Sequence, residues 1–579
     1  MLPMRCVKIA RVKRKPQKAK AQTIPAVEIS DWTTRGAWRG ERFLFPAIAG
    51  LLAAVLLSWG LGDKYLWQDE ANTAVLATRL LRFGKPLCYD GVNLITVDDL
   101  FVENLEPIDL RTKDPKAAIA FQVAHHTFKP DTTWIFHPLG QFVVTAASLK
   151  LLGQTTVAAR LPFALAALLT VLLLYEWVRR YFGSPLMAQI ATTLLIFNSY
   201  WILHGRQCRY YSLSSLFLVL TLIGYSYWQS GGRWGAAAFV ISAWCWFQVD
   251  YGTLWPVLGV LFLDAFLAAG KNFWRPLIVG VVLAATVAPF VYDFRLWERG
   301  GVRHAPWIWL FKGHLFGMNE FVVPFVILAA AAVLTARRWK KLPSLERRLV
   351  AMSCGILVAM LFWVSAVTPD IFLRYTIMAA PIGCAVSAWV LIRGCNFRAT
   401  GAWVWAAVLI LTPWLSLPVR VFNTGVYTKR ESTMLRAELP ILWREVFTSR
   451  PDPNRAVIEW LKQHAAPTDE ILVNYEDLPM MFYLPNPIRG GIAAFRAEDD
   501  AKKPPEFLVI RRSVPFVQWP VFQREADRYK WTEVDLKAPD VIWGNFQDPM
   551  AEDYDFNTDL KIFVARRNPD AEAATPAPR

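Results

Sequence analysis

Residues 157–178 read VAARLPFALAALLTVLLLYEWV, and Arg179 and Arg180 follow directly. A helix of this length reaches about 33 Å, which is enough to cross the hydrocarbon core of a bilayer. A basic pair at the end of such a run is typical of the cytoplasmic flank of a membrane helix. The run therefore predicts a transmembrane helix whose carboxyl end lies in the cytoplasm.

Apolar runs of the same kind recur on both sides of this one. They cover residues 43–61, 185–203, 210–228, 235–252, 254–269, 276–293, 320–336, 349–367, 375–392 and 402–418. Together the runs predict about eleven transmembrane helices, so the expected fold class is a polytopic α-helical membrane protein. The composition agrees, because 54% of the 579 residues are hydrophobic and 19% are charged, against about 25% charged in soluble domains.

Cysteine and charge patterns exclude other classes of protein. The seven cysteines are scattered singly without a CxxC pair, which excludes a disulfide scaffold and a cysteine metal site. The net charge is +16, but residues 1–42 hold eleven Lys or Arg against three acids, whereas residues 419–579 hold 22 Lys or Arg and 25 Asp or Glu. Nucleic acid is therefore not an expected partner, and residues 1–42 are predicted to be a basic cytoplasmic segment.

The basic residues between the apolar runs fall on alternate loops. They are Arg179 with Arg180, Arg233, Lys271 with Arg275, the cluster at 337–348, and Arg393 with Arg398. The positive-inside rule assigns these loops and the N-terminus to the cytoplasm. Residues 43–418 are thus predicted to form a transmembrane domain, whose first outer loop, 62–152, includes juxtamembrane helices.

After Pro418 the hydropathy falls to that of a soluble domain. Residues 454–465 have the pattern of an amphipathic helix, and 470–475 and 506–511 those of buried strands. This alternation predicts an α/β domain over residues 419–567. By the same topology the domain is periplasmic or extracellular. The Ala/Pro/acid-rich end, 568–579, is predicted to be disordered.

The first outer loop opens with Trp67-Gln68-Asp69-Glu70-Ala71, a few residues past the first apolar run. A carboxylate at the membrane surface can accept a proton from an attacking hydroxyl, and its neighbour can orient a partner or hold a metal. The alternative is a solvated turn. The arginines at 206, 209 and 374 lie on the predicted outer side, where they either bind an anion or extend to lipid headgroups.

Five stretches of this sequence together resemble a known family. They are WQDEANTAVLATRLLRFGKPLCYDG (67–91), FHPLGQFVVTAASLKLLG (136–153), TTVAARLPFALAALLTVLLLYEWVRRYFG (155–183), SYWILHGRQCRYYSLSSLFLVL (199–220) and FLRYTIMAAP (372–381). In this order they resemble the GT-C membrane glycosyltransferases. The branch is the family 39-like one of protein O-mannosyltransferases, aminoarabinose transferases and lipopolysaccharide-core glycosyltransferases.

The resemblance implies a hexosyl- or pentosyltransferase of the cell inner membrane. Such an enzyme moves a sugar, with inversion, from a polyprenyl-phosphate carrier to a glycan, lipid or protein acceptor on the outer face. Asp69 matches the family's catalytic aspartate and Glu70 the adjoining acid. Arg374 matches a cation that faces the carrier phosphate, and we expect Arg206 and Arg209 beside it.

Five further residues are expected to contact substrate: His137, Tyr210, Tyr375, Trp307 and Trp309. The two tryptophans either line the entry for the prenyl chain and stack on a sugar, or anchor an interfacial loop at the headgroup layer.

A divalent metal stays open, and no cofactor is assigned. Where the aminoarabinose transferases carry acids, this chain has Trp134-Ile135-Phe136 and Arg209-Tyr210-Tyr211, so no metal ligand is carried over from them. Ligands could instead come from His125, His126 and His137 together with Asp131 or Asp90. The alternative readings are surface histidines and, for Asp90, a turn former.

Two other classes of function remain. A transporter or flippase of lipid-linked sugars needs acids near the bilayer centre, whereas Asp264 and Glu176 lie near the ends of their runs. A non-catalytic envelope assembly protein should tolerate Asp69→Asn.

Overall fold

The computed structural model describes residues 41–95, 133–296, 306–338, 342–368, 371, 373–418, 438–448, 451–490, 504–511, 526–540 and 561–570. Almost all of the predicted basic segment and most of the predicted tail lie outside these residues, as do His125, His126 and Asp131.

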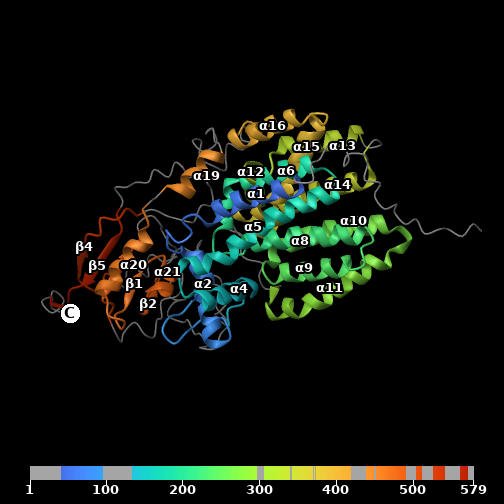
Figure 1. Cartoon of the computed structure of the whole chain (residues 1–579). Helices are drawn as coiled ribbons and strands as arrows, with labels where there is room; N and C mark the ends of the chain where they lie inside the picture. Colours follow the sequence, from blue (N-terminus) through green and yellow to red (C-terminus); the bar gives the residue numbers. More distant parts are fainter. Residues whose placement is uncertain are drawn as a thin grey trace, which may run out of the picture.

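Each predicted apolar run contains a helix (Figure 1). The helices of this part are α1 (Glu41–Ser58), α2 (Gln68–Phe83), α4 (Gly140–Leu152), α5 (Thr156–Tyr181), α6 (Pro185–Ile196), α7 (Ser199–Gly205), α8 (Tyr211–Gln229), α9 (Gly235–Phe247), α10 (Tyr251–Ala269), η2 (Gly270–Asn272), α11 (Trp274–Asp293), α12 (Trp307–Phe321), α13 (Phe325–Arg338), α14 (Ser344–Val367), η4 (Leu373–Ala379), α15 (Ala380–Gly394) and α16 (Ala399–Leu411).

Length and composition qualify five segments of the described chain as membrane spans, or up to seven if each bent helix pair counts as one. Four shorter apolar helices, including α9 and α16, accompany them. The chain is thus polytopic, while the count of eleven spans stays a prediction.

Two predicted spans, 185–203 and 320–336, are not continuous helices. The α6–α7 pair bends by 68° and the α12–α13 pair by 81°. Asn198 ends the first run locally, because its side chain accepts the backbone N–H of Trp201 and caps α7. Pro324 stands at the second break, where it has no N–H to continue the helix. A hydropathy profile does not reveal either helix break.

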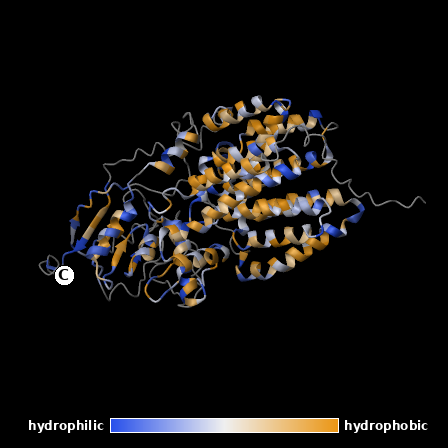
Figure 2. Cartoon of the chain, viewed as in Figure 1, coloured by the Kyte–Doolittle hydropathy of each residue, from blue (hydrophilic) through white to orange (hydrophobic). Residues whose placement is uncertain are grey.

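The bundle has two chemically different ends. Helix α5 begins near the first outer loop, where Arg160 contacts Glu70, and ends in Arg179 and Arg180. Ion pairs at that far end join Arg179 to Glu176, Arg348 to Asp264, and Arg393 to Glu346. Figure 2 shows the hydrophobic middle of the helices between more hydrophilic ends. The described start of the first outer loop and these three arginines therefore lie at opposite ends of the bundle, and which end faces the cytoplasm stays a prediction.

The C-terminal unit consists of α20 (Pro453–His464), α21 (Asp477–Tyr483) and a five-stranded sheet, and it lies at one end of the bundle (Figure 1). The strands are β1 (Ile471–Val473), β2 (Ile488–Gly490), β3 (Phe507–Ile510), β4 (Trp531–Val534) and β5 (Phe563–Arg567). Their order is β2-β1-β3-β5-β4, with β1 parallel to β2 and β3, and β5 antiparallel to β3 and β4. The predicted amphipathic helix and both predicted strands are present.

The sequence after Pro418 is not separate from the bundle. Helix α19 (Glu438–Phe447) places Leu442 and Val446 in the apolar core of the membrane part, and α21 adds Leu478 and Phe482. Helices α2 and α4 lie between the sheet and the long helices (Figure 1). The C-terminal unit is therefore packed against the first outer loop.

Candidate active site

The predicted catalytic aspartate lies where three elements begin. Asp69 is in the first turn of α2, Arg209 immediately precedes the N-cap of α8, and Arg374 lies in η4. Oδ2 of Asp69 is 2.9 Å from Nη1 of Arg374 and 3.8 Å from Nη2 of Arg209. Arg209 also donates to the Asp69 carbonyl at 3.1 Å. The structure thus brings together one predicted acid and two predicted cations, with one positive charge in excess.

Glu70, the second predicted acid, faces a different environment. It is fully buried and makes a two-point ion pair with Arg160, whose Nε and Nη2 lie 2.8 and 2.6 Å from its two oxygens. The backbone N–H of Cys208 donates to the same carboxylate at 2.7 Å. Arg160 in turn donates to the carbonyls of Leu61 and Lys64. Glu70 therefore holds the loop before α2 and the segment before α8, rather than pointing at a substrate.

His137 lies beside Arg209. Nε1 of Trp134 donates to Nδ1 of His137 at 3.2 Å. A tryptophan N–H and a guanidinium only donate, so a neutral His137 ring, which has one bare nitrogen, accepts either from Trp134 or from Nη2 of Arg209, which lies 3.4 Å from Nε2, but not from both. The Arg209 guanidinium also lies 5.5 Å from the centre of the Tyr210 ring. His137 and Tyr210 thus lie beside Arg209, and their contact with substrate stays a prediction.

Buried donors gather around Asp69. Nε1 of Trp67, Nε of Arg209 and the hydroxyl of Tyr211 are buried and have no hydrogen-bond partner among the residues described. The Arg374 guanidinium lies 5.9 Å from the Trp67 ring centre and 6.0 Å from that of Tyr375. Buried polar groups in native proteins are almost always satisfied. Oδ2 of Asp69 also makes no hydrogen bond among the residues described, so this place has unused capacity to bond a polar group.

Three predicted residues lie elsewhere. Arg206 donates to the carbonyl of Trp59. Trp307 stacks on Phe311 and is 37% exposed, and Trp309 is 43% exposed on the same helix, α12. The structure describes no contact between these three side chains and Asp69. Their exposure agrees with the alternative in which the tryptophans anchor an interfacial helix.

The described residues contain no cluster of three or more His, Cys, Asp or Glu side chains that could hold a metal. His137 is engaged by Trp134, as described above. Asp90 pairs with Arg79 at 2.9 Å and accepts the backbone N–H groups of Val92 and Asn93. This is the turn-forming role that was one of the two readings of Asp90. The remaining candidate ligands lie outside the described residues.

A separate cavity lies where the two bent helix pairs meet. Its lining includes Asn198 at one break, Phe321 at the other, and Ser416 beyond α16. Glu320 is its one charged lining residue. This cavity lacks the cations that an anionic donor needs, so the Asp69 cluster remains the candidate for chemistry.

The sequence interpretation missed Trp67, Arg160 and Tyr211 as site residues. Trp67 precedes the predicted acids directly, and Tyr211 follows the predicted Arg209-Tyr210 pair, so proximity was an available signal for both. Arg160 was hidden inside an apolar run. An arginine that interrupts such a run generally needs a buried partner, and that signal points to Glu70.

No family model matches the sequence, and no curated protein sequence does. Among solved structures, ArnT from Cupriavidus metallidurans bound to undecaprenyl phosphate matches with a TM-score of 0.53 and 14% identity, over 91% of this chain and 98% of that one. The same protein in the apo state matches with a TM-score of 0.54 and 14% identity, over 93% and 99%. An oligosaccharyltransferase from Archaeoglobus fulgidus gives a TM-score of 0.43 at 10% identity, over 87% and 74%.

The two ArnT structures cover nearly the whole of both chains, so the likeness includes the C-terminal unit as well as the helices. At 14% identity this likeness concerns the fold. The resemblance to GT-C membrane glycosyltransferases that five short stretches suggested is confirmed at that level. The chain is a polytopic membrane protein whose fold is similar to that of ArnT from Cupriavidus metallidurans.

Proposed function

We propose that this protein is a glycosyltransferase that moves a sugar, with inversion, from a polyprenyl-phosphate carrier to an acceptor at the outer face of the inner membrane. The acceptor class is an envelope glycolipid, polysaccharide or protein. The observation that carries the proposal is the Asp69–Arg209–Arg374 cluster with its unsatisfied buried donors. The undecaprenyl phosphate bound to ArnT, which has the same fold, supports a polyprenyl donor.

The charge of the cluster suits such a donor. Two guanidinium groups face one carboxylate, which leaves one positive charge. A polyprenyl-phosphoryl sugar carries one negative charge on its phosphodiester, and a second develops on the phosphate as the glycosidic bond breaks. Guanidinium groups bind phosphate oxygens with two N–H groups at once. Fixed cations that meet charge as it develops lower the barrier of the reaction.

The carboxylate suits the acceptor side. In this structure, the Asp69 carboxylate pairs with Arg374 at 2.9 Å. When the donor phosphate takes over the guanidinium groups, the Asp69 carboxylate loses part of its ion pairing and becomes a stronger base. It then accepts the proton of the acceptor hydroxyl as that oxygen attacks the anomeric carbon and the carbon–oxygen bond to phosphate breaks. Binding of the donor thus prepares the base.

The proposed role of Glu70 is structural support of this arrangement. Its ion pair with Arg160 fixes the first turn of α2 from behind. His137 and Tyr210, beside Arg209, complete the donor side, and Tyr375, beside Arg374, is proposed to contact substrate.

The transporter alternative loses support from the acids near the ends of the helices. Asp264 pairs with Arg348 at 2.7 Å and accepts from Tyr225, and Glu176 pairs with Arg179. Both carboxylates are thus committed at the end of the bundle away from Asp69. A coupling ion would have to compete with arginine for either of them.

The test is transfer of labelled sugar by the purified protein in lipid nanodiscs. A panel of polyprenyl-phosphate sugars is offered with envelope glycolipid extract as the acceptor, and the product is separated from the carrier. Wild-type protein should transfer one sugar class and release polyprenyl phosphate. Asp69→Asn should lower transfer by roughly 10³ while binding the same donor. Full turnover by Asp69→Asn would refute the role of the base, and movement of intact donor across the bilayer without sugar transfer would establish the transporter instead.

A further inference from the structure

The C-terminal unit holds the chain directly before α2. The backbone N–H of Tyr65 donates to Oδ2 of Asp452 at 2.6 Å, and that of Leu66 donates to the hydroxyl of Tyr483 at 3.1 Å. The carbonyl of Leu66 accepts from Nδ2 of Asn454 at 3.2 Å. Both backbone groups of Leu66 are thus satisfied by side chains that lie 388 and 417 positions later. These bonds fix where α2 begins.

The residue before Asp69 is held in the same way. Nε2 of Gln68 donates to Oδ1 of Asp477 at 2.6 Å, and the backbone N–H of Leu478 donates to Oε1 of Gln68 at 3.3 Å. Gln68 is 1% exposed and Asp477 is fully buried. A buried amide side chain whose oxygen and nitrogen are both hydrogen-bonded is held in one orientation. Gln68 therefore ties the first turn of α2, which carries Asp69, to the N-terminus of α21.

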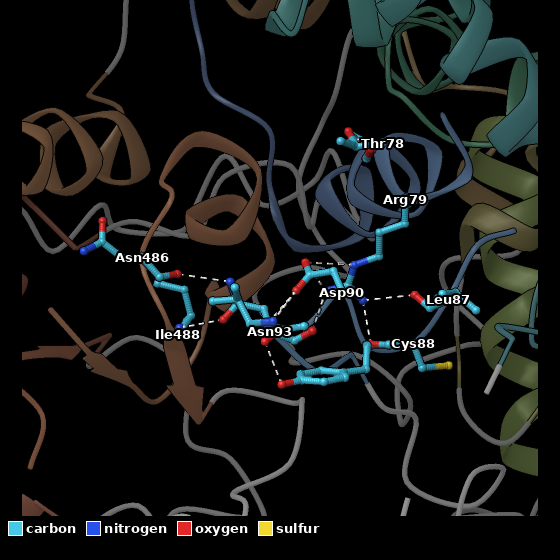
Figure 3. Close-up of polar contacts among 12 residues, drawn as sticks. Thr78, Arg79, Leu87, Cys88, Asp90, Asn93, Asn486 and Ile488 are labelled. Atoms are coloured by element: carbon cyan, nitrogen blue, oxygen red, sulfur yellow. Dashed lines mark hydrogen bonds and ion pairs between the residues drawn. The ribbon is translucent and has the colours of Figure 1, made fainter. Parts of the chain in front are cut away.

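The far end of α2 is tied to the same unit through a second network (Figure 3). Arg79, 2% exposed, donates to the carbonyls of Leu87, Cys88 and Asn93 and to the carboxylate of Asp90. It thereby folds the loop after α2 into one shape.

Asn93 passes this restraint to the sheet. Its Oδ1 accepts the backbone N–H of Ile488 at 2.7 Å, and its Nδ2 donates to the carbonyl of Asn486 at 3.0 Å. Ile488 begins β2, an edge strand of the sheet. Both ends of α2 are therefore anchored on the C-terminal unit.

The contacts at the start of α2 lie near the carboxyl ends of β1 and β3, where α/β proteins bind ligands, whereas Asn93 bonds to Ile488 at the amino end of β2. The chain leaves β1 for β2 on one side and later returns to β3 on the other, so the carboxyl ends of β1 and β3 form a switch point. Asn474 and Arg511 follow these two strands and bond to each other through both backbone groups of Arg511. Arg511 also donates to Asn454, the residue that holds Leu66. In this protein, side chains at the switch point hold the residues directly before α2.

The loop after β1 also reaches the reacting groups. Glu476 has a left-handed backbone with φ of 64°, is buried, and accepts from Asn454. A non-glycine residue in this region is strained, and such strain gathers at functional sites. Its neighbour Tyr475 is 4% exposed and lies close enough to Asp69 and Arg374 for both charges to act on its hydroxyl.

We infer that the C-terminal unit is part of the catalytic machinery as a positioning element, and that Gln68 and Asp477 are the positioning residues that set the place of the Asp69 carboxylate. This inference rests on the proposed function. If the C-terminal unit only selected the acceptor, loss of the Gln68–Asp477 contact would weaken substrate binding. If the unit positions Asp69, the same loss slows the chemical step and leaves the binding of both substrates unchanged.

The experiment changes, and then swaps, the amide of Gln68 and the carboxylate of Asp477. Gln68→Glu places two carboxylates together in a buried contact, so kcat should fall at least tenfold while the KM for the donor stays unchanged. Gln68→Glu with Asp477→Asn restores one donor and one acceptor, and should bring kcat back to within threefold of wild type. Gln68→Met removes both hydrogen bonds without adding charge, and provides the measurement if Gln68→Glu does not fold.

A matched control changes the same unit away from α2. Glu506→Gln removes an ion pair of 2.8 Å with Arg567 on the sheet and should leave kcat unchanged. Amide hydrogen exchange of residues 63–72 is measured in parallel and should accelerate in Gln68→Met but not in Glu506→Gln. Wild-type kcat and exchange in Gln68→Met, or an equal loss of kcat in Glu506→Gln, would overturn the inference. If exchange is faster in Gln68→Met but the wild-type protein transfers no sugar, the proposed function is refuted and the anchoring is not.

Discussion

Asp69 and Glu70 are adjacent in sequence, yet they stand in opposite kinds of ion pair. The Asp69 side chain is 24% exposed and shares two arginines that approach from different elements. The Glu70 side chain is 0% exposed, and both of its oxygens bond to the single guanidinium of Arg160. The first pair retains one positive charge and lies beside unsatisfied donors. The second pair is neutral and accepts a backbone N–H as well.

The difference separates a chemical role from a supporting one. A closed two-point pair in a buried place stabilises geometry, and removal of one partner leaves the other charged and buried. An ion pair with an excess positive charge, such as that of Asp69 with its two arginines, can rearrange when an anion binds to the guanidinium groups. The two acids cannot be told apart by their positions in the sequence. Their surroundings in the structure assign Asp69 to the proposed reaction and Glu70 to the support of the fold.

Asp69→Asn should produce the largest effect on activity. Loss of a general base typically costs about 10² to 10⁴ in rate, and we expect kcat to fall by roughly 10³. Asparagine has the same size and the Asp69 side chain is 24% exposed, so the melting temperature of the protein in detergent should fall less than it does in Glu70→Gln, although Arg209 and Arg374 lose their counter-charge. Turnover measured with saturating donor and acceptor, beside thermal unfolding, checks both parts. A large fall in melting temperature with modest loss of kcat would reverse the roles assigned to the two acids.

Glu70→Gln should show the reverse pattern. Arg160 would remain charged and buried without its ion pair, and broken buried pairs cost about 3–5 kcal/mol. The melting temperature should fall clearly, while kcat per folded molecule should stay within about tenfold of wild type. A matched double variant, Glu70→Leu with Arg160→Met, replaces both charges by apolar groups and should recover much of the stability. If it recovers none, the carbonyl contacts of Arg160 rather than the ion pair hold this region.

The sequence predicted the fold class and part of the site for a physical reason. Long apolar runs and basic loops are local signals, so the helices and their alternation were accessible without a structure. The predicted topology put Asp69, Arg209 and Arg374 on one side of the membrane, but only the family resemblance grouped them in one site, because its members lie as far apart as residues 69 and 374.

Other features depended on contacts that no local pattern encodes. The bend at Asn198 needs a side-chain cap, and the displacement of Arg206 needs the position of the Trp59 carbonyl. The partnership of Gln68 with Asp477 joins residues that are 409 positions apart. Strand prediction did place Tyr475 and Glu476 at the carboxyl end of β1, where the switch-point rule could have marked them.

Arg374→Lys tests whether the open pair binds the donor. Lysine keeps the charge but loses the planar fork that holds two phosphate oxygens. We expect the KM for the donor to rise about tenfold, with a smaller change in kcat. Arg206→Lys is the matched control, since Arg206 contacts the Trp59 carbonyl instead of Asp69, and its KM should stay near wild type. If the two substitutions raise the KM equally, Arg206 also binds the donor, as the sequence predicted.

Glu476→Gln should give the smallest effect, and one that depends on pH. Burial, with added repulsion from Asp477 and Asp69, raises the pKa of Glu476 from 4.5 to about 8 despite the opposing influence of Arg511 and Asn454. The folded protein therefore holds a proton that the unfolded chain releases near pH 4.5, so stability falls as the pH rises from there to about 8 and levels off above. Glutamine has no such proton and still accepts from Asn454. The melting temperature of the variant should match wild type at pH 5 and exceed it by a few degrees at pH 9. Parallel curves for the two proteins would mean that Glu476 is already ionised in the folded state, with Arg511 as its effective counter-charge.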